Sequence, residues 1–124
     1  VLLWEAHSIR SPVPRFFEGR LPDFNFGTSR DASAPAGLAQ ALADTVTRQG
    51  RYTAVANGRF TGGYITRQYG RPSEGVIAVQ LEQSQITYMN ESHPYAYVED
   101  RAKEAAPAVQ AAVEVALEWL RKIS

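Results

Sequence analysis

The apolar positions of the chain fall into short continuous runs and one long periodic stretch. The runs at 1–6 and 75–82 have the pattern of strands that are covered on both faces in an α/β sheet. A shorter run at 52–56 predicts another strand. Apolar residues recur three or four positions apart from 107 to 122, which predicts a helix. Pro107 is expected to kink or interrupt any turn that precedes it.

A second helix is predicted near the middle of the chain. Four apolar residues between positions 38 and 46 lie on one helical face, and Gly50 follows the last of them. Ser33 is the expected N-cap, with Pro35 in the first turn. The order strand, helix, strand, strand, helix indicates an α/β protein in which helices are layered on a sheet.

Two segments between these elements show no periodicity. Residues 8–33 contain three prolines and two glycines and are expected to form one long loop. Loops of this length in compact domains tend to be functional. Residues 57–70 combine four glycines with two Arg, two Tyr and one Phe, but match neither GxxxxGK[ST] nor GxGxxG. This segment is either a turn with packed aromatic rings or a substrate loop whose Arg side chains bind an acidic ligand.

The composition excludes several classes of protein and favours a cytoplasmic one. The chain is a single domain, residues 1–124, in which 13 Lys and Arg balance 13 Asp and Glu, so nucleic acid and membrane are not expected partners. The absence of Cys excludes disulfides and thiolate metal sites. Eleven of the 13 basic residues are Arg, which reflects either base composition or carboxylate binding. Because a buried strand seldom opens a domain, we expect a fragment of a longer one.

Two polar residues stand where the apolar runs end, the place at which α/β sheets carry ligands and catalytic groups. His7 follows the first run and is a candidate metal ligand or a structural histidine. Glu82 ends the run at 75–82 and is a candidate general base beside a metal-bound water, or a solvated charge at a strand end. His93 lies in a predicted loop and is expected to face solvent.

Three blocks of the sequence, taken together, resemble the N-formylglutamate amidohydrolase (deformylase) family. They are EAHSIRS at 5–11 with LPDFNFGT at 21–28, NGRFTGGYITRQYG at 57–70, and QLE at 80–82 followed by YM at 88–89. The likeness covers about residues 2–89 and corresponds to the carboxyl-terminal half of such a protein. The family in turn resembles the zinc carboxypeptidases. The resemblance therefore implies a three-layer αβα fold with a mixed central sheet, zinc carboxypeptidase-like and present here as a partial domain.

The resemblance also implies roles for particular residues. His7 would be the third ligand of one zinc ion, whose other ligands are expected upstream of this chain. Glu82 would be the general base, and Tyr69 matches a mobile tyrosine that contacts the substrate. The remaining residues expected to bind substrate are Arg10, Asn57, Arg59 and Arg67.

The activity that the resemblance implies is zinc-dependent hydrolysis of N-formyl-L-glutamate to formate and L-glutamate, a reaction of histidine degradation. The expected partners are a small N-acylated acidic amino acid and the amino-terminal part of the same protein. Two alternatives stay open. One is another N-acylamino-acid deacylase or a carboxypeptidase, and the other is a non-catalytic remnant that binds acidic ligands and has lost its metal.

Overall fold

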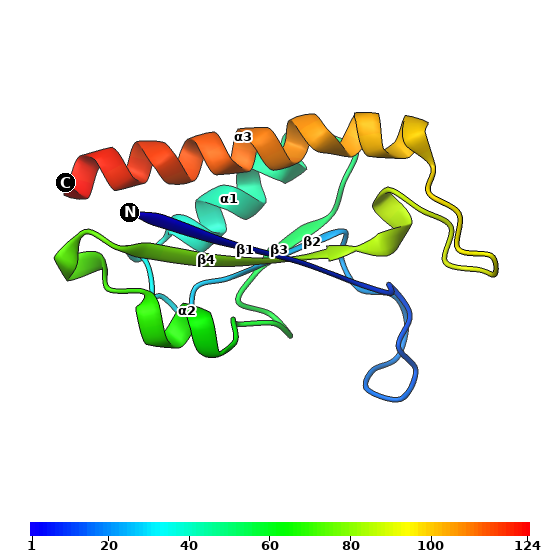
Figure 1. The fold of residues 1–124 in the computed structure, drawn as a ribbon, viewed down its shortest axis with the longest axis horizontal. Helices are drawn as coiled ribbons and strands as arrows, with labels where there is room; N and C mark the ends of the chain where they lie inside the picture. Colours follow the sequence, from blue (N-terminus) through cyan, green and yellow to red (C-terminus); the bar gives the residue numbers. More distant parts are fainter.

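A computed structural model describes all 124 residues as a four-stranded sheet with helices on both sides (Figure 1). The strands are β1 (Leu2–Ile9), β2 (Phe24–Gly27), β3 (Ala54–Ala56) and β4 (Ile77–Ser84). The helices are α1 (Leu38–Thr47), α2 (Tyr64–Tyr69) and α3 (Glu99–Ile123), and short 3-10 turns lie at Pro72–Glu74 and Gln85–Thr87.

The sheet is mixed, as the family resemblance implied. Its strand order is β1-β4-β2-β3. β1 runs parallel to β4 and β2 runs parallel to β3, whereas β2 and β4 are antiparallel. The helices α1 and α3 lie on one side of the sheet and α2 lies on the other (Figure 1). No helix of the chain has the length and apolar character needed to cross a membrane.

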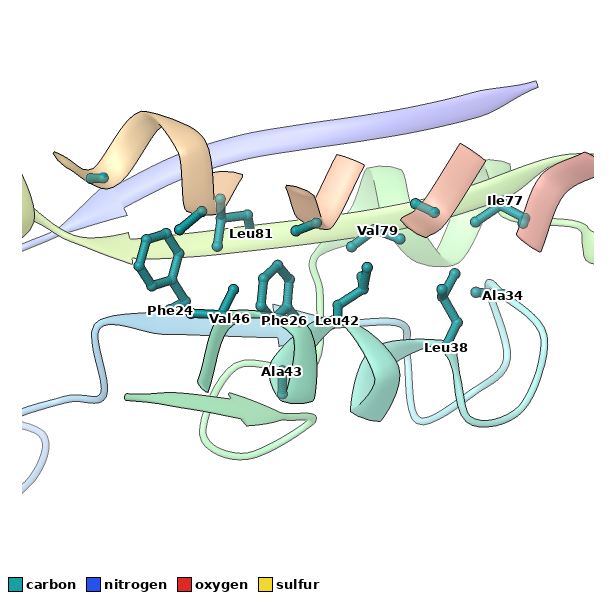
Figure 2. Packing of buried hydrophobic residues seen from close by; sticks show 14 residues of the cluster. Phe24, Phe26, Ala34, Leu38, Leu42, Ala43, Val46, Ile77, Val79 and Leu81 are labelled. Atoms are coloured by element: carbon teal, nitrogen blue, oxygen red, sulfur yellow. The ribbon is translucent and has the colours of Figure 1, made fainter. Parts of the chain in front are cut away.

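The hydrophobic core lies between the sheet and the helices α1 and α3. Figure 2 shows Phe24 and Phe26 of β2 together with Val79 and Leu81 of β4 gathered in this layer. Each is at most 2% exposed, and burial of a side chain of this size contributes about 1.5–3 kcal/mol. The helix α3 contributes only small residues to the same cluster, which lets it lie close to its neighbours: Ala105, Ala108, Ala112 and Ala116.

The prediction for the first strand was wrong in its length and in its environment. β1 extends to Ile9, so His7 lies inside the strand and not after it. It is also the edge strand of this sheet, and its side chains range from half-buried to exposed. The continuous apolar run failed as a sign of two-sided burial because only its first part packs against the core, whereas Ala6, His7 and Ser8, which alternate between the two faces, are all exposed.

Two elements lie in segments that were expected to be irregular. β2 lies within 8–33, and a fully buried strand of four residues is too short to show a period of its own. α2 lies within 57–70, where glycines precede and follow only six helical residues. Both short elements are held by contacts with β4, which no local pattern records.

The helix boundaries also differ from the expected ones. Gly37, with φ of 90°, precedes α1, and Ser33 is not the N-cap, because its buried hydroxyl donates to the carbonyl of Ala78 at 2.8 Å. The helix α3 runs without a break from Glu99 through Pro107. Pro107 is exposed, so its ring points to solvent, and its missing N–H removes a single bond from a helix of 25 residues.

Candidate active site

The sheet face opposite the core carries a row of polar side chains, which we call the polar face: Glu5, His7, Asn25, Gln80 and Glu82. The register places His7 directly beside Glu82 and Glu5 beside Gln80, while Asn25 of β2 lies on the other side of Glu82. Residues paired in this way point to the same side of a sheet. The two residues singled out in the sequence, His7 and Glu82, are therefore brought together by strand pairing.

The imidazole of His7 is half-exposed and is held by a neighbour on its own strand. Its Nε2 lies 2.8 Å from Oε1 of Glu5, and the side chain of His7 is 48% exposed against 18% for Glu5. No hydrogen bond within the chain reaches the other ring nitrogen, Nδ1. A nitrogen that is unpartnered and open to solvent is available to a metal ion or to a ligand.

The carboxyl group of Glu82 is a proton acceptor with a perturbed pKa. Burial raises the pKa of Glu82, the charge of Glu5 raises it further, and His7 lowers it, with burial the largest cause. A carboxyl group whose pKa is raised toward neutrality is suited to take up a proton and then give it away.

The helix α2 is fastened to the polar face at two points. The N–H of Gly63, which precedes α2, donates to Oε1 of Gln80 at 3.0 Å. The buried hydroxyl of Thr66 lies 3.1 Å from Oε2 of Glu5. These contacts attach the segment 57–70, one of whose two predicted interpretations was a substrate loop, to the sheet face that carries His7 and Glu82.

Two predicted substrate residues project from α2 into solvent. Tyr69 is 53% exposed and packs edge-to-face against Tyr64, with ring centroids 6.5 Å apart. Arg67 is exposed and uses Nη1 to donate to the carbonyl of Gly62 at 3.2 Å. Most of the Arg67 guanidinium thus stays free for an anion, and both side chains belong to the helix that covers the polar face.

The other predicted arginines lie farther from α2. Arg59 stacks on the ring of Phe17, with 4.7 Å between its guanidinium carbon and the ring centroid, and donates to the carbonyl of Phe16. Arg10 follows β1 and lines an open cavity of about 370 Å³ that also includes Glu91. No residue of the polar face lines that cavity, so the structure does not bring Arg10 together with His7 and Glu82.

The side chain of Asn57 makes three hydrogen bonds to a neighbouring loop. Its Oδ1 accepts from the N–H groups of Thr28 at 2.9 Å and Arg30 at 3.2 Å, and its Nδ2 donates to Oγ1 of Thr28 at 3.0 Å. Asn57 has φ of 48°, in the left-handed region. A substrate that donated to Oδ1 would have to replace bonds that hold the loop, whereas the second hydrogen of Nδ2 has no partner within the chain.

Four residues of the site escaped the sequence analysis: Glu5, Asn25, Thr66 and Gln80. For Glu5 a signal was available, because residues two apart in a strand lie on the same face, and Glu5 precedes His7 by two positions. Thr66 and Gln80 carried no such signal, because their roles depend on how α2 docks.

The polar face offers part of a metal site. No group of three or more His, Asp or Glu side chains in the chain is arranged to hold a metal ion. One imidazole with a free Nδ1, oriented by a carboxylate on Nε2, fits a single ligand of a zinc site. The residues of this chain therefore fit one ligand of a zinc site and not the complete set of ligands.

A second charged cavity, of about 290 Å³, lies where the start of α3 approaches the turn Gln85–Thr87. Its charged groups are largely paired with one another: Arg20 lies 2.6 Å from Asp23, and Arg51 lies 2.6 Å from Glu104. The latter pair is exposed and raises the pKa of Arg51. None of the residues of the polar face lines this cavity.

Comparison with known proteins identifies the family. The model of the N-formylglutamate amidohydrolase family matches residues 1–89. N-formylglutamate deformylases of Pseudomonas aeruginosa and Pseudomonas putida are 50% and 47% identical over 121 and 118 residues, which is 98% and 95% of this chain but 46% and 44% of theirs.

The fold has a counterpart among solved structures. The crystal structure of N-formylglutamate amidohydrolase from Ralstonia eutropha superposes with a TM-score of 0.76 at 23% identity, covering 96% of this chain and 43% of that one. The chain thus spans about half the length of the relatives it matches. With the family model matching most of its residues, the chain belongs to the N-formylglutamate amidohydrolase family.

Proposed function

We propose that this chain supplies the general base, one zinc ligand and the substrate helix of an N-formylglutamate deformylase. The observation that carries the proposal is the register of β1 and β4, which places His7 beside Glu82 on the sheet face to which α2 is attached through Glu5 and Gln80. Two relatives at about half identity bear the name N-formylglutamate deformylase, which supports the substrate class. The reaction is hydrolysis of N-formyl-L-glutamate to formate and L-glutamate.

Zinc is the metal that we propose for this site, in a zinc carboxypeptidase-like arrangement. His7 would hold it through Nδ1, with Glu5 on Nε2, and the remaining ligands would come from outside these 124 residues. When bound, zinc lowers the pKa of a coordinated water and polarises a carbonyl oxygen.

Glu82 is the group that moves the proton. As water attacks the formyl carbon, the Glu82 carboxylate accepts a proton from it, and the same carboxyl later delivers that proton to the amine nitrogen as the C–N bond breaks. Because burial raises the pKa of Glu82, its protonated form is more accessible near neutral pH than that of an exposed glutamate.

The two carboxylates of N-formylglutamate require cationic partners, and Arg67 is the best placed. It is exposed on α2, the helix that contacts both β1 and β4. Tyr69, on the same helix, offers an exposed phenol hydroxyl as a further substrate contact. Arg59 stands in the loop before α2 and is the second candidate, although its guanidinium is partly engaged with Phe17.

Substitution of Glu82 and of His7 in a deformylase polypeptide that carries this chain tests the proposal. Glu82→Gln should lower kcat for formate release by about 10²–10⁴ and leave the zinc content unchanged, because Gln keeps the shape but accepts no proton. His7→Ala should lower the zinc content and, with it, the activity. Glu18→Gln, which changes an exposed carboxylate without a partner, is the matched control.

Three outcomes would contradict the proposal. A Glu82→Gln enzyme with full activity would exclude Glu82 as the general base. Cleavage of peptides without release of formate from N-formylglutamate would favour the carboxypeptidase alternative. A chain that retains the fold but neither binds zinc nor releases formate in the complete polypeptide would favour the ligand-binding alternative.

A further inference from the structure

The carboxyl group of Glu5 contacts two parts of the site at once. Oε1 lies 2.8 Å from Nε2 of His7, and Oε2 lies 3.1 Å from the hydroxyl of Thr66. We propose that Glu5 is a positioning residue that fixes the ring of His7 and ties it to the substrate helix α2. This inference rests on the proposed function, which places Glu5 on Nε2 of His7, and adds to it the contact of Glu5 with Thr66 and the tautomer of His7 that the two contacts fix.

Both partners of Glu5 are presented in a fixed way. His7 lies two residues further along β1, so both side chains leave the same face of the strand. Thr66 is 1% exposed, and a Cβ on Gly62 would come within 3.0 Å of its side chain, which shows how closely the preceding loop confines it. The hydroxyl of Thr66 therefore has little freedom to turn away from Glu5.

The chemistry of the two contacts decides the state of the imidazole. A carboxylate accepts hydrogen bonds and donates none, so an ionised Glu5 can pair with Nε2 only when that nitrogen carries the proton. The neutral ring is then the Nε2–H form, and Nδ1 keeps a free lone pair. Because Thr66 donates to the second oxygen, both oxygens of the Glu5 carboxylate have a partner. A movement of α2 would therefore shift Glu5 and, through it, the ring of His7.

The proposal predicts the tautomer of His7 in the metal-free chain. Long-range proton–nitrogen NMR spectra of the imidazole nitrogens, recorded above the ordinary His pKa of about 6.5, report it directly. The chain has one other histidine, His93, which is exposed in a loop and serves as an internal reference. We expect His7 to be confined to the Nε2–H form and His93 to show the mixture of tautomers of a free ring.

Two pairs of variants complete the test. Glu5→Gln should release His7 toward the mixture seen for His93, because an amide can donate as well as accept, whereas Glu18→Gln should leave both rings unchanged. Thr66→Val should shift His7 in the same direction but less, while Thr66→Ser, which keeps the hydroxyl, should not. The Thr66 pair carries the test even where Glu5→Gln fails to fold.

A second readout concerns the metal and not the rate. In a deformylase polypeptide that carries this chain, Glu5→Gln should weaken zinc binding by about 10–100-fold in chelator competition, the usual cost of removing a carboxylate behind a histidine ligand. A His7 spectrum that is identical in the wild type and in Glu5→Gln, or a Thr66→Val chain that behaves like Thr66→Ser, would overturn the proposal. The tautomer experiment needs neither zinc nor substrate, so failure of the proposed function would leave its result standing.

Discussion

At the residue scale, Glu82 links the proposed chemistry to the stability of the fold. Burial raises the pKa of Glu82, so the folded chain binds that proton more tightly than the unfolded chain does. The stability that this group contributes is therefore fully present below the ordinary pKa of glutamate and is lost as the pH rises through the folded-state pKa. At neutral pH the ionised carboxylate is a net cost to folding.

Glu82→Gln should accordingly stabilise the metal-free chain at pH about 7 and have little effect at pH about 4. Urea unfolding of the wild-type and Glu82→Gln chains at the two pH values measures the difference in their free energy of unfolding. The titration of all other acids is common to both chains and cancels in this difference. Glu18→Gln, which removes one carboxylate at an exposed position, is the matched control. A Gln variant that is less stable than the wild type at neutral pH would contradict the sign of the shift.

Asn57 is a residue for which the structure and the family resemblance point to different tasks. Asn57→Ala removes its bonds to Thr28 and Arg30 and leaves an alanine at φ of 48°. We expect a loss of about 1–3 kcal/mol in the free energy of unfolding. Asn57→Gly, which tolerates that φ, should lose less. Unchanged stability together with a raised KM would show instead that Asn57 serves the substrate.

At the scale of elements, the sequence predicted those helices and strands whose apolar pattern is long enough to show a period. β4 and α1 have long apolar patterns, and both were predicted within a few residues of their bounds. Phe24 to Gly27 form a strand because β4 pairs with them on one side and β3 on the other, a fact absent from four residues of sequence. The same holds for α2, whose Thr66 is buried by its docking and not by its own period.

The helix α3 makes a prediction of its own, because it continues through Pro107. Pro107→Ala restores one helical hydrogen bond at an exposed position and should raise the free energy of unfolding by about 1–3 kcal/mol. This gain is reduced because alanine, unlike proline, does not restrict the conformations of the unfolded chain. Urea unfolding measures it, with Ala106→Ser as a control expected to cost no more than about 0.7 kcal/mol. A destabilised Pro107→Ala chain would show that the proline shapes a bend on which the packing against α1 depends.

At the scale of the whole molecule, the candidate site is assembled from distant parts of the chain. His7 and Glu82 could be singled out as candidates in the sequence, since each ends or follows an apolar run. Their direct juxtaposition was not, because it depends on the parallel pairing of two strands separated by about 70 residues and by two helices. The contacts of Glu5 with Thr66 and of Gln80 with Gly63 arise from the same long-range arrangement.

The last prediction concerns what this chain does alone. Its polar face contributes one imidazole, and no three metal-ligating side chains converge anywhere in the 124 residues. Retention of zinc requires several deprotonated ligands in fixed geometry. We therefore expect the purified chain to lose zinc on dialysis and to release no formate from N-formylglutamate. Metal analysis and a formate assay check this, with the Pseudomonas putida deformylase, of which the chain matches 44%, as the positive control. One zinc ion per chain after dialysis would mean that Glu5 or Glu82 binds metal beside His7, and the division into a ligand, a base and a positioning residue would then fail.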